Sequence, residues 1–454
     1  MLVYRYSLIC IIFFSFYSSA STLEKDRLVT FFSSIESHGF SIDKNDWLSL
    51  VKDSSTPNLQ RLYKKYMTFI DLGRLNKTLF QNAWEIPDIE THFGGGNQFL
   101  PIEQIQSKIP AYQMLRKALR DLKQWRETAL QLFPDDIIFF EGDTNMQIAK
   151  LGDWLVDIDL INHHLGSVYL KQHLDVLTQV QLEYNLMPDG RFGPSTRQAL
   201  LSITNKRIKM LKANLERLRW LPQKIHPPYV WVDIPGFTVS WIDAQGKKYH
   251  HRAIVGKPAN KTPILQDEIS TITINPVWKV PHRIAAHRLL RSEQKSPGLL
   301  KKEGFLVYES WDDKASVIDA ATIQWAKYSP KTFTFRLEQQ PGENNRLGKY
   351  RFNIMNKQSI YLHDTNDRTL FDKKRRMFSS GCIRVDGSDK FFSYLISTQD
   401  AVISQQSTGT TLKIPLNKPV DVYLSYFTAW PDSNGRVRFR DDIYNYDEPL
   451  VSWF

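Results

Sequence analysis

The chain contains only two cysteines among its 454 residues, Cys10 and Cys382. Two cysteines cannot build a disulfide-stapled small domain or a cysteine-rich zinc site. Beyond residue 20 the sequence also lacks an uninterrupted apolar run of membrane-spanning length, which excludes a polytopic membrane protein. The glycines of FGGGNQF (93–99) are not followed by Lys-Ser/Thr, so this loop is not a phosphate cradle. These absences leave an ordinary globular protein long enough for two or three domains.

The first twenty residues, MLVYRYSLICIIFFSFYSSA, have the features of a secretory signal peptide. They combine an early charge at Arg5, an apolar run from Leu8 to Phe16, and a small-residue ending before Ser21. We expect cleavage there and a periplasmic location, with an uncleaved N-terminal anchor or outright secretion as alternatives. Cleavage removes Cys10 and leaves Cys382 as the sole thiol.

The charge balance of the chain is strongly basic. The formal net charge is +11, and loss of the signal subtracts only Arg5, which gives +10. An exported basic protein suits an anionic polymer such as the cell wall. Nucleic acid is not an expected partner, because no basic motif interleaved with aromatic residues is present.

The remaining cysteine lies in FSSGCIRV (378–385), and two interpretations of it are open. A lone thiol is usually a buried, inert small hydrophobe. A nucleophile instead needs a base within reach, and His363 ends the strand-like run SIYLHDT nineteen residues upstream. Gly381 lets the backbone approach a substrate, and the amides of Gly381 and Cys382 could stabilise an oxyanion. The residues alone favour catalysis only slightly.

His363 followed by SSGCIR (379–384) resembles the motif of the L,D-transpeptidases. The similarity covers most of residues 228–450, including AIVGKP (253–258) with the Thr-Pro pair at 262–263, INPVWKVP (274–281) and LGKYRFNI (347–354). It implies an α+β multidomain protein whose catalytic domain is mainly β and carries a cap insertion.

The resemblance implies a role for each residue of the motif. The nucleophile is the thiol, the histidine is the base, a backbone carbonyl after the histidine orients the imidazole, and the arginine supports the loop or a substrate carboxylate. Ser380 departs from the family, because many relatives have a second histidine there. The resemblance therefore implies four catalytic residues, Cys382, His363, Gly381 and Asp364. It also implies four substrate-binding residues, Tyr361, Arg384, Ser380 and Ser379.

The implied reaction is acyl transfer on peptidoglycan stem peptides. The thiol attacks a tetrapeptide stem, the terminal D-alanine leaves, and the amine of a second stem completes a 3-3 cross-link; the partners are stem peptides and glycan, and carbapenems are expected inhibitors. No cofactor or metal is expected, because the histidine pairs 163–164 and 250–251 have no HExxH motif or cysteine pair beside them. The alternatives are a carboxypeptidase, a lipoprotein attachment or release enzyme, and a non-catalytic wall-binding scaffold.

The segment QVQLEYNLMPDGRFGPSTRQAL (179–200) resembles a three-helix peptidoglycan-binding module with a DGxxGPxT turn. After it, Ile208, Leu211 and Leu215 have helical spacing, with Thr204 or Asn205 as a possible N-cap. The basic residues of this helix are expected on a solvated face.

Upstream of this module, an amphipathic pattern from Tyr112 to Trp125 predicts a mainly helical N-terminal region. The expected organisation is a signal peptide (1–20), a helical scaffold domain (21–160), a peptidoglycan-binding-like domain (161–205), a connecting helix and linker (206–227), and the catalytic domain (228–454) with a cap insertion at about 284–345.

Overall fold

The computed structural model describes residues 30–52, 56–75, 84–85, 102–399 and 409–452. The signal-peptide prediction therefore lies outside the described residues. The chain divides into two compact units. The helical unit comprises residues 1–81, 86–225 and 427–454, and the sheet unit comprises residues 82–85 and 226–426. Within the described ranges, no helix combines the length and apolarity that crossing a bilayer requires.

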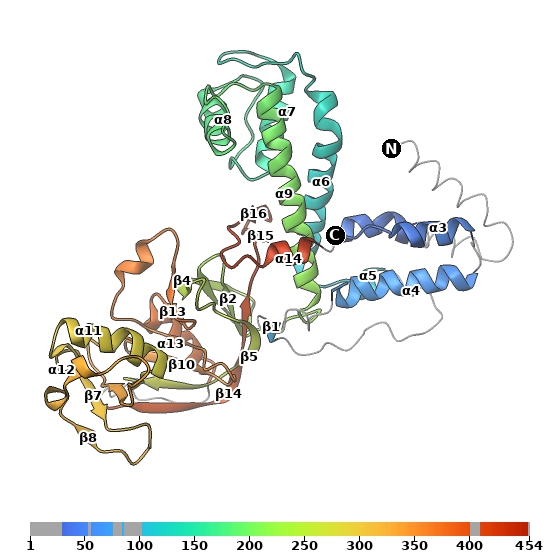
Figure 1. The fold of residues 1–454 in the computed structure, drawn as a ribbon. Helices are drawn as coiled ribbons and strands as arrows, with labels where there is room; N and C mark the ends of the chain where they lie inside the picture. Colours follow the sequence, from blue (N-terminus) through green and yellow to red (C-terminus); the bar gives the residue numbers. More distant parts are fainter. Residues whose placement is uncertain (1–29, 53–55, 76–83, 86–101, 400–408, 453–454) are drawn as a thin grey trace. The chain divides into compact units, whose positions relative to one another are not determined.

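The helical unit is built around two long helices that lie side by side, α6 (Pro110–Leu132) and α9 (Pro194–Arg219) (Figure 1). The predicted apolar stripe of α6 is confirmed, because Tyr112, Leu115 and Leu119 are fully buried. The other elements of this unit are η1 (Ile35–His38), α3 (Lys44–Lys52), α4 (Thr56–Leu72), α5 (Ile102–Ile105), α7 (Met146–Asp157), α8 (Lys171–Glu183), β15 (Ala429–Pro431), β16 (Val437–Phe439) and α14 (Asp447–Val451).

The DGRFGPST turn joins α8 to α9 and is organised by one buried amide. The Gln181 side chain accepts from the Gly190 backbone N–H at 2.7 Å and donates to Asp189 and Thr196 at 2.9 and 3.1 Å. Gly190 has a φ of +68°, and an added Cβ would lie 2.8 Å from Leu174. The motif residues therefore hold the turn together internally.

Helix α9 runs without interruption from Pro194 to Arg219, so the predicted new N-cap at Thr204 or Asn205 is wrong. The Thr204 hydroxyl instead donates to the Leu200 carbonyl at 2.8 Å and accepts from the Trp154 indole at 2.9 Å. A threonine that bonds to the preceding turn is compatible with the helix interior. The Thr204 hydroxyl, which had been predicted to cap a helix, instead forms a buried contact between α9 and α7.

The last turns of α9 also depart from the predicted solvated basic face. Arg217 and Arg219 are almost completely buried, Arg217 against Asp447 and Arg219 against Glu216. The Thr428 hydroxyl donates to the same Asp447 carboxylate at 2.7 Å. These contacts explain why residues 427–454 belong to the helical unit, whereas the sequence analysis had placed them in the catalytic domain.

The sheet unit is a barrel-like sheet, because its strand order β5-β10-β11-β13-β4-β3-β2-β14 returns to β5. The strands of this closed circuit are β2 (Tyr229–Asp233), β3 (Thr238–Ile242), β4 (Lys248–Gly256), β5 (Ile264–Ile274), β10 (Tyr350–Ile354), β11 (Tyr361–His363), β13 (Ile383–Val385) and β14 (Leu412–Ser425). Attached to them are β1 (Trp84–Glu85), β12 (Met377–Ser379), η6 (Thr369–Asp372) and α13 (Ser388–Ile396).

Alternation along the strands separates a buried face from a face that carries polar groups. On β10, Tyr350, Phe352 and Ile354 are buried, whereas Arg351 and Asn353 are half-buried. Successive side chains of a strand point to opposite faces, so the two sets lie on opposite sides of the sheet. The polar set continues onto β11 and β13 and forms the floor of the candidate site.

The insertion has a small sheet and a hydrophobic core of its own. Its core residues extend from Trp278 to Leu347, a longer span than the 284–345 predicted. The insertion contains β6 (Trp278–Lys279), α10 (His282–Ile284), the π-helical η3 (Ala285–Leu289), α11 (Leu290–Lys295), α12 (Leu299–Lys302), β7 (Phe305–Tyr308), β8 (Val317–Ile318), η4 (Ala320–Thr322), η5 (Trp325–Lys327) and β9 (Arg336–Gln339).

Candidate active site

The parallel pairing of β11 with β13 brings the two halves of the motif together. Leu362 lies opposite Ile383, and His363 lies opposite Arg384. Alternation puts Tyr361 and His363 of β11 on one face, and the cross-strand pairing puts Arg384 of β13 on the same face; Cys382 directly precedes β13. Cys382 is close to the strand that carries the histidine, because the side chain of Tyr361 interacts with both the thiol and the ring of His363.

Cys382 is half-buried, and its sulfur does not form a hydrogen bond with the imidazole of His363. Its hydrogen bond goes to the Ser359 carbonyl oxygen at 3.8 Å. Burial raises the pKa of the Cys382 thiol, although hydrogen bonds from Tyr361 and the positive charges of Arg351 and Arg384 act in the opposite direction. The resting cysteine is therefore a neutral thiol at neutral pH.

Tyr361 lies at the centre of the site and connects it to the insertion. Burial raises the pKa of its hydroxyl, which is within hydrogen-bonding reach of Cys382 and of the Trp278 indole. Its ring contacts that of His363 with centroids 5.6 Å apart and lies 4.1 Å from the Arg351 guanidinium. Tyr361 also packs against the core of the insertion. One side chain thus touches the thiol, the histidine strand and the insertion.

His363 is 5% exposed, and burial lowers the pKa of its imidazole to about 3, with Arg384 adding electrostatic repulsion. The backbone carbonyl of Asp364 partly opposes this shift. Among the described residues, the buried Nδ1 atom has no hydrogen-bond partner of normal geometry. The imidazole is therefore neutral and able to accept a proton.

The carboxylate of Asp364 faces away from the imidazole. It accepts from the Lys349 backbone N–H at 2.9 Å and pairs with Arg368 at 3.1 Å. An added Cβ at Gly348, where φ is +61°, would lie 2.3 Å from this carboxylate. The Asp364 side chain therefore anchors the loop after β11, and only its main-chain carbonyl influences His363.

Thr262 orients the peptide group between Gly381 and Cys382. In the sequence this residue was noted only as part of a Thr-Pro pair. Its hydroxyl accepts from the Gly256 N–H at 2.8 Å and donates to the Gly381 carbonyl at 2.7 Å. In a trans peptide the N–H points opposite to the carbonyl, so this bond directs the Cys382 N–H away from Thr262. The Gly381 N–H is already engaged by the Ser379 hydroxyl at 3.1 Å.

The two serines of the motif are placed differently. Ser379 is buried and Ser380 is exposed. Gly381 between Ser380 and the sulfur has a φ of +125°, and an added Cβ would lie 3.2 Å from Ile360. A side chain at Gly381 would therefore be strained and crowded.

Several residues at this site were not identified from the sequence. Arg351 and Trp278 contact Tyr361, and Arg288 and Arg346 of the insertion act electrostatically on Arg384. Strand alternation could have found Arg351, because it shares a face with the histidine. The arginines of the insertion could not have been found in this way, since a separately folded segment brings them to the strand.

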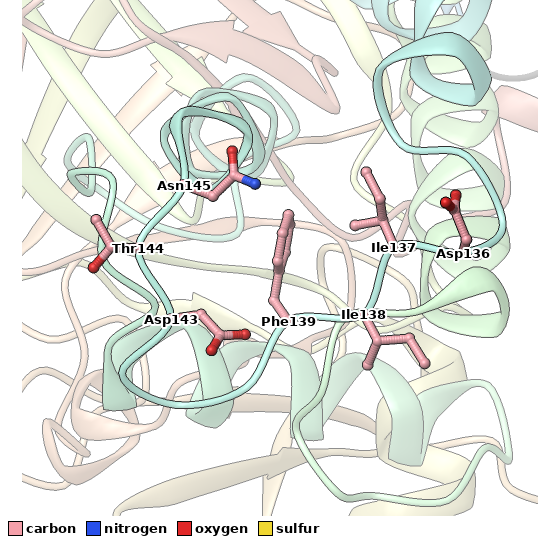
Figure 2. Close-up of a pocket in the computed structure, with 7 residues that line it drawn as sticks. All are labelled: Asp136, Ile137, Ile138, Phe139, Asp143, Thr144 and Asn145. Atoms are coloured by element: carbon pink, nitrogen blue, oxygen red, sulfur yellow. The ribbon is translucent and has the colours of Figure 1, made fainter.

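The helical unit contains a second hollow, of about 310 Å³, which the loop before α7 encloses (Figure 2). One lining residue, Ile138, is an exposed apolar side chain, and so is Phe140 two residues later in the chain. The Arg191 guanidinium lies 4.8 Å from the Phe140 ring. Its lining combines apolar and polar side chains, so it is a candidate binding site. Its lining residues are Asp136, Ile137, Ile138, Phe139, Asp143, Thr144 and Asn145.

Comparison with known proteins agrees with the motif. Residues 227–414 match the YkuD family, described as the L,D-transpeptidase catalytic domain. A Haemophilus influenzae protein named "Putative L,D-transpeptidase" is 31% identical over 308 residues, covering 65% of this chain. The chain spans 60% of the length of that relative.

A solved structure, of residues 123–326 of an L,D-transpeptidase from Xylanimonas cellulosilytica, is 12% identical and covers 64% of this chain and 99% of that one. Its TM-score of 0.16 is too low to add to the argument. The match over residues 227–414 includes β11, which ends at His363, and the turn between β12 and β13 that contains Cys382. Residues 227–414 therefore resemble the L,D-transpeptidase catalytic domain, in agreement with the similarity to the Haemophilus influenzae protein.

Proposed function

We propose that this protein is a cysteine-dependent L,D-transpeptidase that forms 3-3 cross-links between peptidoglycan stem peptides. The observation that supports the proposal is that β11 and β13 of the family-matched sheet pair His363 with Arg384, while the half-buried Cys382 directly precedes β13. A thiol, a neutral imidazole and an available backbone N–H are the groups that acyl transfer requires.

The first half of the reaction is acylation of the cysteine. The neutral imidazole of His363 accepts the thiol proton, and the sulfur attacks the carbonyl that precedes the terminal D-alanine of a tetrapeptide stem. The N–H of Cys382, directed by Thr262, stabilises the tetrahedral oxyanion. The imidazolium then protonates the departing amine, so D-alanine leaves and a thioester remains.

The second half of the reaction transfers the acyl group to another stem. The side-chain amine of the acceptor attacks the thioester, His363 takes its proton, and the thiol is released. Each amide broken is replaced by an amide, so the exchange needs no external energy source. Trp278 and the core of the insertion lie against Tyr361 and can shield the thioester from water.

The test uses purified protein with a disaccharide-tetrapeptide substrate and mass spectrometry. We expect release of D-alanine, formation of a cross-linked dimer, and a carbapenem adduct on the wild-type protein that is absent from Cys382→Ala. Tripeptide monomer without dimer would instead establish a carboxypeptidase. Transfer of the stem to a protein lysine would establish a lipoprotein attachment enzyme, and absence of both turnover and adduct would leave a non-catalytic scaffold.

We further propose that the protein is exported to the periplasm and that its helical unit associates with peptidoglycan. The basic net charge and the exposed Ile138 and Phe140 near the hollow of Figure 2 support this association. Co-sedimentation of the full chain with isolated sacculi tests it. We expect Ile138→Asn/Phe140→Asn to reduce the bound fraction, whereas Leu48→Asn, at another exposed leucine, should not.

A further inference from the structure

The loop between β10 and β11, residues 355–360, contacts the candidate nucleophile at two points. The sulfur of Cys382 donates a hydrogen bond to the Ser359 carbonyl oxygen at 3.8 Å. The Ile360 side chain lies beside Gly381, because a Cβ added at this glycine would be 3.2 Å from it. The loop therefore contacts both residues of the peptide group that precedes the sulfur.

The side chain of Asn356 closes this loop. Its carbonyl oxygen accepts from the backbone N–H groups of Gln358 and Ile360, both at 3.0 Å. Its amide nitrogen donates to the backbone carbonyls of Ile354 and Ile360 at 3.1 and 2.7 Å. These four hydrogen bonds join the end of β10 to the last residue before β11, so one half-buried amide fixes the backbone of the whole loop.

The backbone of Ser359 depends on this network. Ser359 has a φ of +56°, a left-handed conformation that is uncommon for residues other than glycine. Such a conformation persists only where surrounding contacts hold it. The next residue, Ile360, has both its N–H and its carbonyl bound by Asn356. The direction of the Ser359 carbonyl toward the sulfur therefore follows from the asparagine.

The contact between sulfur and carbonyl acts on the protonation state of Cys382. A carbonyl oxygen accepts a hydrogen bond from a thiol, but it has no proton to donate to a thiolate and repels its negative charge. The Ser359 carbonyl thus stabilises the neutral thiol and directs its proton to the loop instead of to His363. Once the proton has been removed, the same oxygen repels the sulfur, which is then free to turn toward a bound donor.

We propose that Asn356 is a positioning residue for the nucleophile, because it fixes the loop whose Ser359 carbonyl holds Cys382 in its resting, protonated form. The nucleophile then starts each reaction from one defined side-chain orientation. The importance of this orientation for turnover rests on the proposed function, whereas the resting contact itself does not.

The test compares two loops that are closed in the same way. Asn356→Ala in the full-length protein removes all four hydrogen bonds, and Asp243→Ala is the matched control. Asp243 closes the loop between β3 and β4 by accepting from the N–H groups of Gln245 and Lys247 at 3.0 and 2.8 Å. This control loop lies at the opposite end of β4 from Gly256, the residue near the candidate site. If thermal melting shows that Asn356→Ala is unfolded, Asn356→Asp replaces it, because aspartate still removes the two donated bonds.

The S–H stretching band of Cys382 in the infrared spectrum reports the contact directly. Subtracting the spectrum of the matching Cys382→Ala protein isolates the band. We expect Asn356→Ala to move it to higher frequency, because an S–H bond without an acceptor is stronger. Iodoacetamide labelling of Cys382, followed by peptide mass spectrometry, should reach half its maximal rate roughly half a pH unit lower, because the neutral thiol loses a hydrogen bond.

The Asp243→Ala control should change neither the band nor the labelling profile. An unchanged band in Asn356→Ala, an unchanged labelling profile, or equal shifts in the two variants would overturn the proposal. Release of D-alanine by the wild-type protein separates this result from the proposed function. If the band shifts but no D-alanine is released, the catalytic proposal fails and the positioning role stands; if D-alanine is released and the band does not shift, catalysis stands and the positioning role fails.

Discussion

Replacing Thr262 by valine is the sharpest test of how the backbone around Cys382 is held. Valine has nearly the same shape but lacks the hydroxyl that accepts from the Gly256 N–H at 2.8 Å and donates to the Gly381 carbonyl at 2.7 Å. Thr262 is fully buried, so water cannot readily replace these contacts. Each unsatisfied backbone group costs about 1–3 kcal/mol, and two of them therefore cost roughly 2–6 kcal/mol.

The same substitution should reduce catalysis, because the Gly381 carbonyl no longer fixes the direction of the Cys382 N–H. Loss of one oxyanion donor typically lowers kcat by about 10²–10³. Thr262→Ser is the matched control, since it keeps the hydroxyl and removes one buried methyl, a loss of about 1 kcal/mol.

Denaturant unfolding followed by tryptophan fluorescence gives the stability of each variant, and D-alanine release gives the rate. We expect Thr262→Val to lose both stability and kcat, and Thr262→Ser to remain close to wild type in kcat. Valine and serine variants with equal kcat and equal unfolding midpoints would refute the role assigned to the hydroxyl.

Three further predictions concern the histidine, the thiol and the helical unit. The pKa of His363 is about 3 when folded and about 6.5 when unfolded, so stability should fall by about 1.4 kcal/mol per pH unit as pH drops from about 6 to 4, and His363→Gln should flatten that decline in equilibrium unfolding. Tyr361→Phe should slow iodoacetamide labelling of Cys382 at pH 8, because a hydrogen bond that lowers the thiol pKa is lost; unchanged labelling would contradict the contact. Arg217→Met should destabilise the helical unit by about 3–5 kcal/mol in thermal unfolding, since it leaves Asp447 buried without its cation, and adding Asp447→Asn should restore part of the loss.

The apolar stripe of α6 could be predicted from the sequence because its physical cause is local. The His-Cys motif could be found in the sequence because its residues lie close together along the chain. Tyr112, Leu115 and Leu119 lie on one face of a helix whatever that helix packs against. The order and spacing of His363 and Cys382 were informative because they resemble the L,D-transpeptidase motif.

The errors and omissions arose where distant segments meet. Arg217 looked like a solvated cation because its partner Asp447 is 230 residues away in the sequence. Thr204 looked like a helix start because its partner Trp154 lies on another helix. Trp278 contacts Tyr361 as part of the hydrophobic core of the insertion, which no local pattern reveals.

The closed strand circuit limits how the two halves of the motif can approach each other. Strand β11 has neighbours on both sides, β10 and β13, and β13 is likewise held by β4. Sliding either strand would break ladder hydrogen bonds along two flanks, so the distance between the backbones of His363 and Cys382 is set by the architecture. Rotation of the imidazole and thiol about their own side-chain bonds is then the motion that joins them. In the proposed reaction, proton transfer would therefore require rotation of only the His363 and Cys382 side chains, while the backbone keeps its position.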